Sequence, residues 1–235
     1  MISGLQKMTL LDYPGKVACT VLTQGCNFRC PFCHNSDLLG KDGPEPIPQD
    51  TLLTFLGKRR GLLDGVCITG GEPTLDNGLE GLLEKIKALG FLVKLDTNGS
   101  RPQVLKALVE KGLVDYVAMD IKNCPDRYGQ TVGVPKIDLR PIEESIRYLL
   151  SGAVDYEFRT TVVDEMHDEQ AMETIGAWLT ALDGAHKAKR FFLQPYVDRE
   201  SVLMAGLHAP EREKLLAMAE KLRPFAQTVD IRALD

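Results

Sequence analysis

The chain has 235 residues, of which 44% are hydrophobic and 26% charged, and its formal net charge is −5. This composition is typical of a soluble globular protein and disfavours intrinsic disorder. The acidic balance disfavours sequence-independent binding to nucleic acid, which needs a basic surface. No stretch approaches the roughly 20 apolar residues of a membrane span, and residues 1–7 lead into no long apolar signal segment. We therefore expect a cytoplasmic protein without nucleic-acid or membrane partners.

Short apolar, β-branched runs alternate with longer amphipathic segments along the whole chain. The predicted strands are residues 17–22, 65–69, 91–95, 116–121, 156–163 and 190–193, with a candidate seventh at 228–231. The predicted helices are residues 49–60, 79–89, 102–111, 141–150, 168–182 and 210–222. Strands that alternate with helices of this length predict βαβ units and a parallel sheet. Because no linker, repeat or low-complexity segment interrupts the pattern, we expect residues 1–235 to form a single α/β domain.

Three cysteines, Cys26, Cys30 and Cys33, follow the first predicted strand. In a reducing compartment they are expected to be free thiols, which makes them candidate metal ligands. Thiolates suit both iron–sulfur clusters and zinc. A structural zinc site needs a fourth ligand, and the nearest candidate, His34, is awkwardly placed beside Cys33. An iron–sulfur cluster held by three cysteines would instead leave one iron open to a substrate.

Polar residues follow several predicted strands at the point where each strand ends. They are Gly70-Gly71-Glu72-Pro73, Asp96-Thr97-Asn98-Gly99, Asp120 with Lys122, and Gln194-Pro195-Tyr196, while Arg159 lies within the fifth strand. In a parallel barrel or half-barrel the strand ends share one face, where active sites are built, so we expect a single site.

Each of these motifs also has a purely structural interpretation. Gly70 and Gly71 fit either a flexible turn or a backbone that approaches a ligand closely. Arg159 fits either a solvated strand face or a fork that binds a ligand carboxylate. Two carboxylates at neighbouring strand ends, Asp96 and Asp120, would be costly without a cation between them.

The spacing Cys26-x3-Cys30-x2-Cys33, with Phe32 before the last cysteine and Gly70-Gly71-Glu72-Pro73 further on, resembles the radical S-adenosylmethionine (SAM) superfamily. The resemblance implies a partial (β/α)6 TIM-type barrel and a [4Fe–4S] cluster held by the three cysteines, with SAM on the open iron. It also implies reductive cleavage of SAM to a radical that abstracts a hydrogen atom. The backbone at Phe32 would meet the adenine. Gly70, Gly71 and Glu72 would line the methionyl amine.

Within that superfamily the chain resembles the glycyl-radical-enzyme activases. The matching motifs are Pro31-Phe32-Cys33-His34-Asn35, Asp96-Thr97-Asn98-Gly99, Asp120-Ile121-Lys122 and the segment 128–134. The resemblance implies that Asp96, Thr97 and Asp120 help to hold a monovalent cation against the SAM carboxylate. It also implies that Arg159 contacts SAM.

Two segments depart from the pattern of pyruvate formate-lyase activases. Asp12-Tyr13-Pro14-Gly15 replaces Asp-Gly-Pro-Gly, and Gln194-Pro195-Tyr196-Val197 lacks a final histidine. Both variants resemble the subgroup that activates anaerobic ribonucleotide reductases. We therefore predict an activase for such a partner, with flavodoxin or ferredoxin as the electron donor.

Three alternatives stay open. The chain could activate a pyruvate formate-lyase-like enzyme. It could be a radical SAM enzyme that acts on a small molecule such as a 7-deazaguanine precursor. The third alternative is a zinc-bound interaction module that uses the three cysteines and His34.

Overall fold

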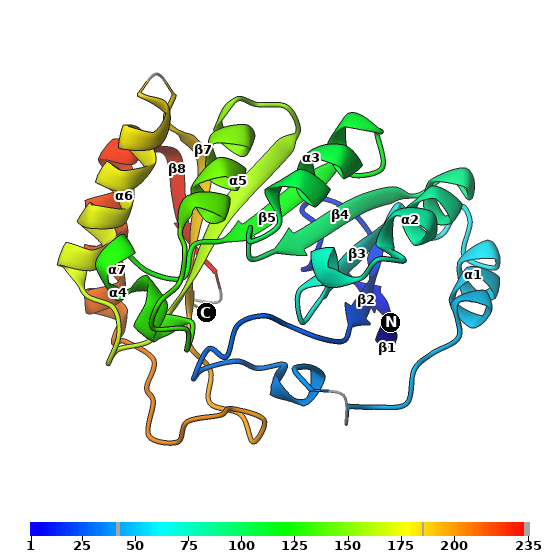
Figure 1. Ribbon diagram of the computed structural model, residues 1–235, viewed down its shortest axis with the longest axis horizontal. Helices are drawn as coiled ribbons and strands as arrows, with labels where there is room; N and C mark the ends of the chain where they lie inside the picture. Colours follow the sequence, from blue (N-terminus) through cyan, green and yellow to red (C-terminus); the bar gives the residue numbers. More distant parts are fainter. Residues whose placement is uncertain (41–42, 185, 233–235) are drawn as a thin grey trace. The chain divides into compact units, whose positions relative to one another are not determined.

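The computed structural model describes residues 1–40, 43–184 and 186–232. Over these residues, eight strands follow one another in chain order in a mostly parallel sheet (Figure 1). The chain divides into two compact units. The first comprises Met1–Asn27, Asn35–Thr97 and Arg101–Val117, and the second comprises Phe28–His34, Asn98–Ser100 and Ala118–Asp235. The expectation of one domain stays a prediction.

The first unit contains the strands β1 (Ile2–Thr9), β2 (Ala18–Thr23), β3 (Gly65–Gly70) and β4 (Leu92–Thr97), and the start of β5 (Tyr116–Asp120). Its helices are α1 (Gln49–Gly57), α2 (Leu79–Ala88) and α3 (Pro102–Glu110), with short 3-10 turns at Ser36–Leu38 and Pro73–Leu75. β1 is antiparallel to β2, whereas β2, β3 and β4 are parallel. The register pairs Thr23 with Gly70. The ends of β2 and β3 are therefore level with each other.

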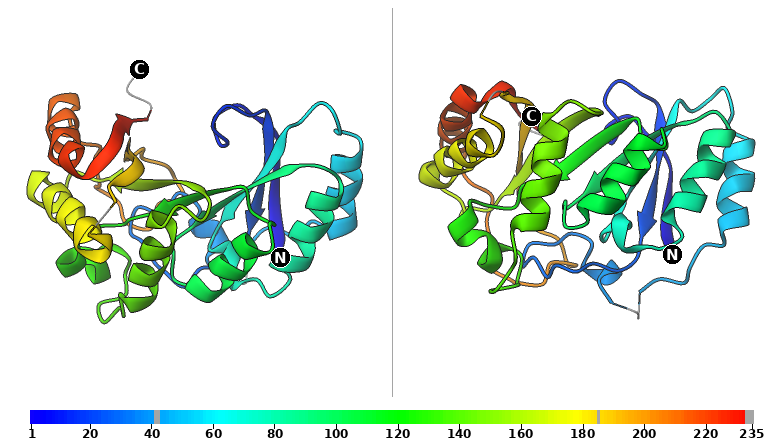
Figure 2. Two further views of the ribbon diagram at one scale, coloured as in Figure 1. Left: turned by 90° about the horizontal axis from the view of Figure 1, so that it is seen from above. Right: turned by 45° about the horizontal axis from the view of Figure 1, so that its top comes forward.

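The second unit contains the end of β5 and three further strands, β6 (Asp155–Val162), β7 (Ala188–Pro195) and β8 (Ala226–Ile231). β7 is parallel to both β6 and β8. The helices of this unit are α4 (Pro125–Thr131), α5 (Arg140–Leu150), α6 (Glu169–Asp183) and α7 (Arg212–Leu222), and a 3-10 turn, Arg223–Phe225, precedes β8. Helices α6 and α7 pack together, and α7 also contacts β7 and β8 (Figure 2).

The strand side chains form the cores of both units. Val66, Ile68 and Leu95 in the first unit and Phe158 in the second are fully buried. Burial raises the pKa of the Cys19 thiol on β2 to about 12, so this cysteine stays protonated in the core. A few charged side chains are also buried, namely Glu72, Lys94 and Glu157. Buried charges need partners, and Glu157 has one, because Arg232 bonds both of its carboxylate oxygens at 2.6 and 2.7 Å.

All seven predicted strands and all six predicted helices are present, with ends that shift by a few residues. The sequence analysis missed β1, which makes the sheet only mostly parallel, and it missed the short helix α4. The Gly- and Pro-containing stretch at residues 39–48 also predicts a long loop, of which positions 41 and 42 lie outside the described residues. Among the described residues, no helix has the length and apolar character that crossing a membrane requires.

Candidate active site

The three cysteines lie on the segment that follows β2. Cys26 belongs to the first unit, and Cys30 and Cys33 belong to the second. Cys30 is buried, whereas the other two are partly exposed. A turn joins the Cys33 N–H to the Cys30 carbonyl at 3.1 Å. Among the described residues, no three Cys, His, Asp or Glu side chains are already gathered as a metal site, so the ligand set stays a prediction.

Other segments of the second unit hold the cysteine loop by its backbone. The Arg29 N–H donates to the Val132 carbonyl at 2.8 Å. Gly133, at a φ of +68°, lies so close that a Cβ there would be 2.5 Å from the Arg29 carbonyl oxygen. On the other side of the loop, the Met204 N–H donates to the Pro31 carbonyl at 3.0 Å. The positions of Cys30 and Cys33 are therefore fixed by contacts from two distant parts of the chain.

The side chains that flank Cys33 are also engaged. The ring of Phe32 is buried and meets the edge of the His167 ring, with 6.5 Å between centroids. Nε2 of His34 donates to the Val197 carbonyl at 2.6 Å, since a carbonyl can only accept. Burial lowers the pKa of His34. One of the two ring nitrogens of His34 is thus committed to the backbone, which disfavours the zinc alternative.

The turn Gly70-Gly71 packs against the segment that leads into Cys26. A Cβ at Gly70, where φ is +113°, would lie 2.5 Å from backbone atoms of Thr23. A Cβ at Gly71 would lie 2.2 Å from the Gly25 carbonyl oxygen, and the Glu72 N–H donates to that same oxygen at 2.8 Å. Both glycines are thus required by a close approach within the chain itself, which neither interpretation of the sequence had included.

Glu72 is 1% exposed and lies within a set of neutral donors in the first unit. Its Oε1 accepts hydrogen bonds from the Thr74 N–H at 3.1 Å, the Thr74 hydroxyl at 2.5 Å and the Thr97 hydroxyl at 2.8 Å. These three bonds orient the carboxylate. The structure thereby brings together two predicted site residues, Glu72 and Thr97, from the ends of neighbouring strands.

A lysine that the sequence analysis did not single out lies beside Asp96. Lys94 is 1% exposed and forms an ion pair with Asp96 Oδ1. The thiol of Cys67 on β3 lies 3.9 Å from Lys94 Nζ and 3.8 Å from Asp96 Oδ1. A lysine two positions before an aspartate in an otherwise apolar strand was the available signal, because side chains at i and i+2 share one face of a strand.

Asp120, Lys122 and Arg159 form a charged trio in the second unit. Arg159 Nε donates to Asp120 Oδ1 at 3.0 Å, and Lys122 Nζ donates to Oδ2 at 2.8 Å. The Arg159 side chain is only 11% exposed, so it does not lie on a solvated strand face. Burial raises the pKa of Asp120, but Arg159 and Lys122 outweigh that effect and hold it well below its usual range. Burial likewise opposes the charge of Lys122, and Asp120 outweighs it and raises the pKa of Lys122.

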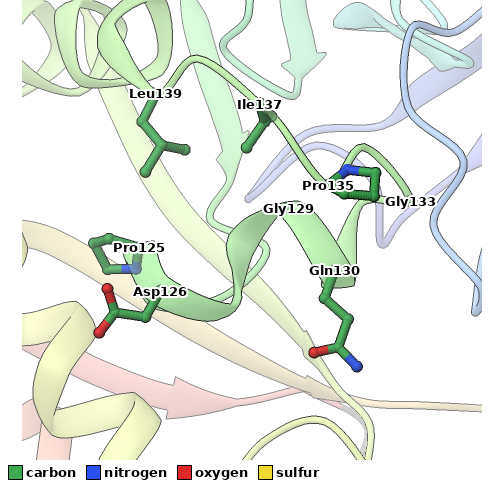
Figure 3. Close-up of a pocket in the computed structure, with 8 residues that line it drawn as sticks. All are labelled: Pro125, Asp126, Gly129, Gln130, Gly133, Pro135, Ile137 and Leu139. Atoms are coloured by element: carbon green, nitrogen blue, oxygen red, sulfur yellow. The ribbon is translucent and has the colours of Figure 1, made fainter.

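A pocket of about 480 Å³ opens beside α4 in the second unit (Figure 3). Its lining residues are Pro125, Asp126, Gly129, Gln130, Gly133, Pro135, Ile137 and Leu139. Figure 3 shows the side chains of Ile137 and Leu139 on the same side of α4, with Gln130 on the other. None of these lining residues was predicted to bind a cofactor. Gly133 nevertheless belongs to both features, because it lines the pocket and also lies against Arg29 in the cysteine loop.

Comparison with known proteins places the chain in a family. The radical SAM superfamily model matches residues 20–177. A Methanocaldococcus jannaschii protein whose assigned name is glycyl-radical enzyme activating enzyme is 30% identical, over 100% of this chain and 97% of its own. A pyruvate formate-lyase-activating enzyme from Clostridium pasteurianum is 31% identical over 83% of this chain and 81% of its own.

Solved structures agree with this assignment at the level of the fold. A domain of pyruvate formate-lyase-activating enzyme from Bacteroides vulgatus has a TM-score of 0.56 and 20% identity, over 70% of this chain and 98% of its own. The structure of native anSMEcpe with bound AdoMet has a TM-score of 0.61 and 15% identity, over 89% of this chain and 61% of its own. The predicted partial barrel is thus confirmed.

The chain belongs to the radical SAM superfamily, whose members use a [4Fe–4S] cluster and SAM. More narrowly, it is an enzyme of the glycyl-radical-enzyme activating type.

Proposed function

We propose that this enzyme uses SAM, bound at a [4Fe–4S] cluster on Cys26, Cys30 and Cys33, to form a glycyl radical on an anaerobic ribonucleotide reductase. The observation that carries the activating role is the similarity over the full chain to a glycyl-radical enzyme activating relative. Three thiolates with backbone support fit an iron–sulfur cluster. When bound and reduced by one electron, the cluster supplies the cleavage of SAM. We propose flavodoxin or ferredoxin as the electron donor and the cytoplasm as the compartment.

The charged groups suit the two ends of the amino-acid portion of SAM. Glu72 is a buried carboxylate that hydrogen bonds from Thr74 and Thr97 orient, and we assign it to the SAM amine. The trio of Asp120, Lys122 and Arg159 carries two positive charges and one negative, which leaves a net +1. We assign this trio to the SAM carboxylate, with Arg159 as the principal contact. The backbone at Phe32 is our candidate for the adenine.

The glycines contribute to the site by their fit to the chain. Gly70 and Gly71 let the turn after β3 lie against Thr23 and Gly25. That contact connects the Glu72 backbone to the residue directly before Cys26. The side chain of Asn35, which follows the cysteine loop, donates to the Gly70 carbonyl at 3.2 Å. In this proposal the two glycines position Glu72 for SAM, and their own contacts are with protein.

The choice of partner rested on two sequence variants, one at Tyr13 and one at Val197, and these two residues have different surroundings in the structure. Tyr13 is 4% exposed, and its ring lies 6.0 Å from that of Tyr116 in the first unit's core. Its role is therefore packing, and it says little about a partner. Val197 is half exposed and lies on the segment that supports His34. The proposal of a ribonucleotide reductase partner accordingly depends on the 194–197 variant.

The experiment is an activation assay with two candidate partners. The anaerobically reconstituted enzyme, SAM and a one-electron reductant are mixed either with an anaerobic ribonucleotide reductase or with a pyruvate formate-lyase. We expect a glycyl-radical electron paramagnetic resonance signal on the reductase alone, with 5′-deoxyadenosine formed alongside. Cys30→Ser is the control, and it should yield neither product because the cluster loses a ligand.

Each alternative gives a different result in the same assay. A radical on pyruvate formate-lyase alone would reassign the partner. If 5′-deoxyadenosine formed only when a 7-deazaguanine precursor was added, the substrate would be a small molecule. Stoichiometric zinc without iron in anaerobically purified protein would refute the radical mechanism altogether.

A further inference from the structure

A buried lysine lies on the strand that ends at the proposed SAM site. Lys94 is on β4 between Val93 and Leu95, which are both fully buried. Its own side chain is 1% exposed. An ammonium in such surroundings loses its hydration, and only a close anionic partner compensates for that loss. The lysine therefore needs an anionic partner in its immediate surroundings.

That partner is Asp96, on the same face of the strand two residues later. The Lys94 ammonium contacts Asp96 Oδ1, and the Asp96 side chain is 12% exposed. The Cys67 thiol on β3 also lies beside the pair, 3.9 Å from Lys94 Nζ. The pair is electrically neutral, and its positive member is covalently part of the chain.

The other residues that the resemblance assigns to a monovalent cation are also engaged with protein groups. The Thr97 hydroxyl donates its proton to Glu72 Oε1 at 2.8 Å. In the second unit, Asp120 presents one oxygen to Arg159 and the other to Lys122. Each predicted cation ligand thus has a protein partner within its own unit. The donor set does not fit a vacant cation site.

We propose that the Lys94 ammonium provides at Asp96 the positive charge that the resemblance attributes to a bound monovalent cation, so that SAM binding needs neither Na⁺ nor K⁺. The inference rests on the proposed function, because it concerns the same SAM site. An inorganic cation at Asp96 would have to displace the ammonium or lie beside it, and repulsion between like charges opposes the second arrangement. Lys94 is thus a positioning residue, which acts on SAM through Asp96.

The charges of the first unit agree with this role. Because Asp96 is paired with Lys94, the Glu72 carboxylate is the acidic group of this unit that we assign to the SAM amine. Without Lys94, the ends of β3 and β4 would carry two carboxylates, and an added cation would be needed to relieve their repulsion. The lysine therefore determines whether salt composition affects the site.

The test is SAM affinity in buffers of different cation content. Calorimetric titrations of the reconstituted holoenzyme are made in tetramethylammonium chloride and in the Na⁺ or K⁺ salt, all at about 100 mM so that ionic strength is constant. For the wild type we expect dissociation constants that agree within about twofold in all three salts. Lys94→Met should bind SAM about tenfold more weakly in tetramethylammonium and recover in Na⁺ or K⁺.

The matched control is Lys87→Met. Lys87 also pairs with an aspartate in the first unit, Asp115 at 2.7 Å, but outside the proposed site. Its removal should leave SAM binding independent of the cation. Lys94→Gln, which keeps a hydrogen-bond donor and much of the volume, serves as a second variant if Lys94→Met loses its cluster, as judged by iron content.

The wild-type titrations are the first test of the proposal. Tightening of SAM binding by about tenfold or more when K⁺ or Na⁺ replaces tetramethylammonium would overturn it, while the proposed function would stand. Cation-independent binding by both Lys94 variants would also overturn it. If the wild-type holoenzyme bound no SAM in any of the three salts, the proposed function would fail, and this inference with it.

Discussion

Gly71 lies against the carbonyl group of Gly25, where an added Cβ would come within 2.2 Å of the oxygen. The obstructing atom belongs to backbone, which cannot rotate away as a side chain could. This single contact brings the turn after β3 onto the residue directly before Cys26. It explains why the position must be glycine without any reference to a ligand.

Gly71→Ala should therefore displace Glu72 and lower SAM affinity by about tenfold or more. The matched control is Gly81→Ala. Gly81 lies within α2, where a Cβ would meet no atom within 4 Å. Because alanine is the better helix former, the control should gain about 0.5–1 kcal/mol of stability. Calorimetry and urea unfolding measure the two effects, and equal SAM affinity in both variants would contradict the assignment.

Gly133→Ala should reduce the iron bound after reconstitution. A Cβ at Gly133 would be 2.5 Å from the Arg29 carbonyl oxygen, one residue before Cys30. Gly152 has a similar positive φ, +77° against +68°, but its Cβ would meet nothing within 4 Å. Gly152→Ala therefore has the backbone strain alone, about 1–2 kcal/mol, and should keep its iron. We expect affinity for the cluster to fall by about 10- to 100-fold in Gly133→Ala only, as measured by iron content and visible absorption.

Thr97→Val should weaken SAM binding and destabilise the enzyme. It removes the 2.8 Å hydrogen bond to Glu72 Oε1 while it keeps the size of the side chain. Both residues are buried, so the cost should be about 1–3 kcal/mol of unfolding free energy. Thr174→Val is the control, since that hydroxyl bonds the Gln170 carbonyl on the exposed side of α6. Urea unfolding of the holoenzyme should show a loss for the first variant and nearly none for the second.

The affinity for SAM should show no titration of the Asp120, Lys122 and Arg159 trio near neutral pH. The pKa of Asp120 is lowered, so this carboxyl is ionised at every pH above the ordinary pKa of an aspartate. The pKa of Lys122 is raised, so this amine is protonated at every pH below the ordinary pKa of a lysine. The net charge of +1 therefore holds from about pH 5 to about pH 9. Calorimetry over this interval should show a pH dependence of SAM affinity that comes only from the amine of SAM. A further pH transition that is present in the wild type and absent in Arg159→Met would mean that the trio titrates, and it would refute the assignment.

The sequence predicted the repeating elements well because each had a strong periodic signal. β1 was missed because Gly4, Gln6 and Lys7 interrupt any apolar alternation in an antiparallel strand whose burial is partial. α4 was missed because it has only seven residues, one of them Gly129, too few to show a helical period. Pairing with β2, and not a local pattern, determines β1.

For the site, motif spacing predicted the cysteines and Glu72, but it could not reveal what each side chain contacts. Lys94 is the clearest case. The two-residue spacing puts Asp96 on the same strand face as Lys94. Only the register of β3 and β4, however, places Cys67 beside this lysine. The packing role of Tyr13 was hidden in the same way, because its partner Tyr116 is about a hundred residues away.

The hydrogen bonds that hold the cysteine loop also constrain how this enzyme can diverge. The Ser201 hydroxyl donates to the His34 carbonyl at 2.8 Å, and the Met204 N–H donates to Pro31. The same segment exposes Val197 and Leu203 to solvent. A loop graft that exchanges this stretch with that of a relative would remove both supports together with the exposed surface. A graft of the segment that exposes Val197 and Leu203 must therefore restore those two hydrogen bonds. Without them, we expect the grafted protein to lose its cluster.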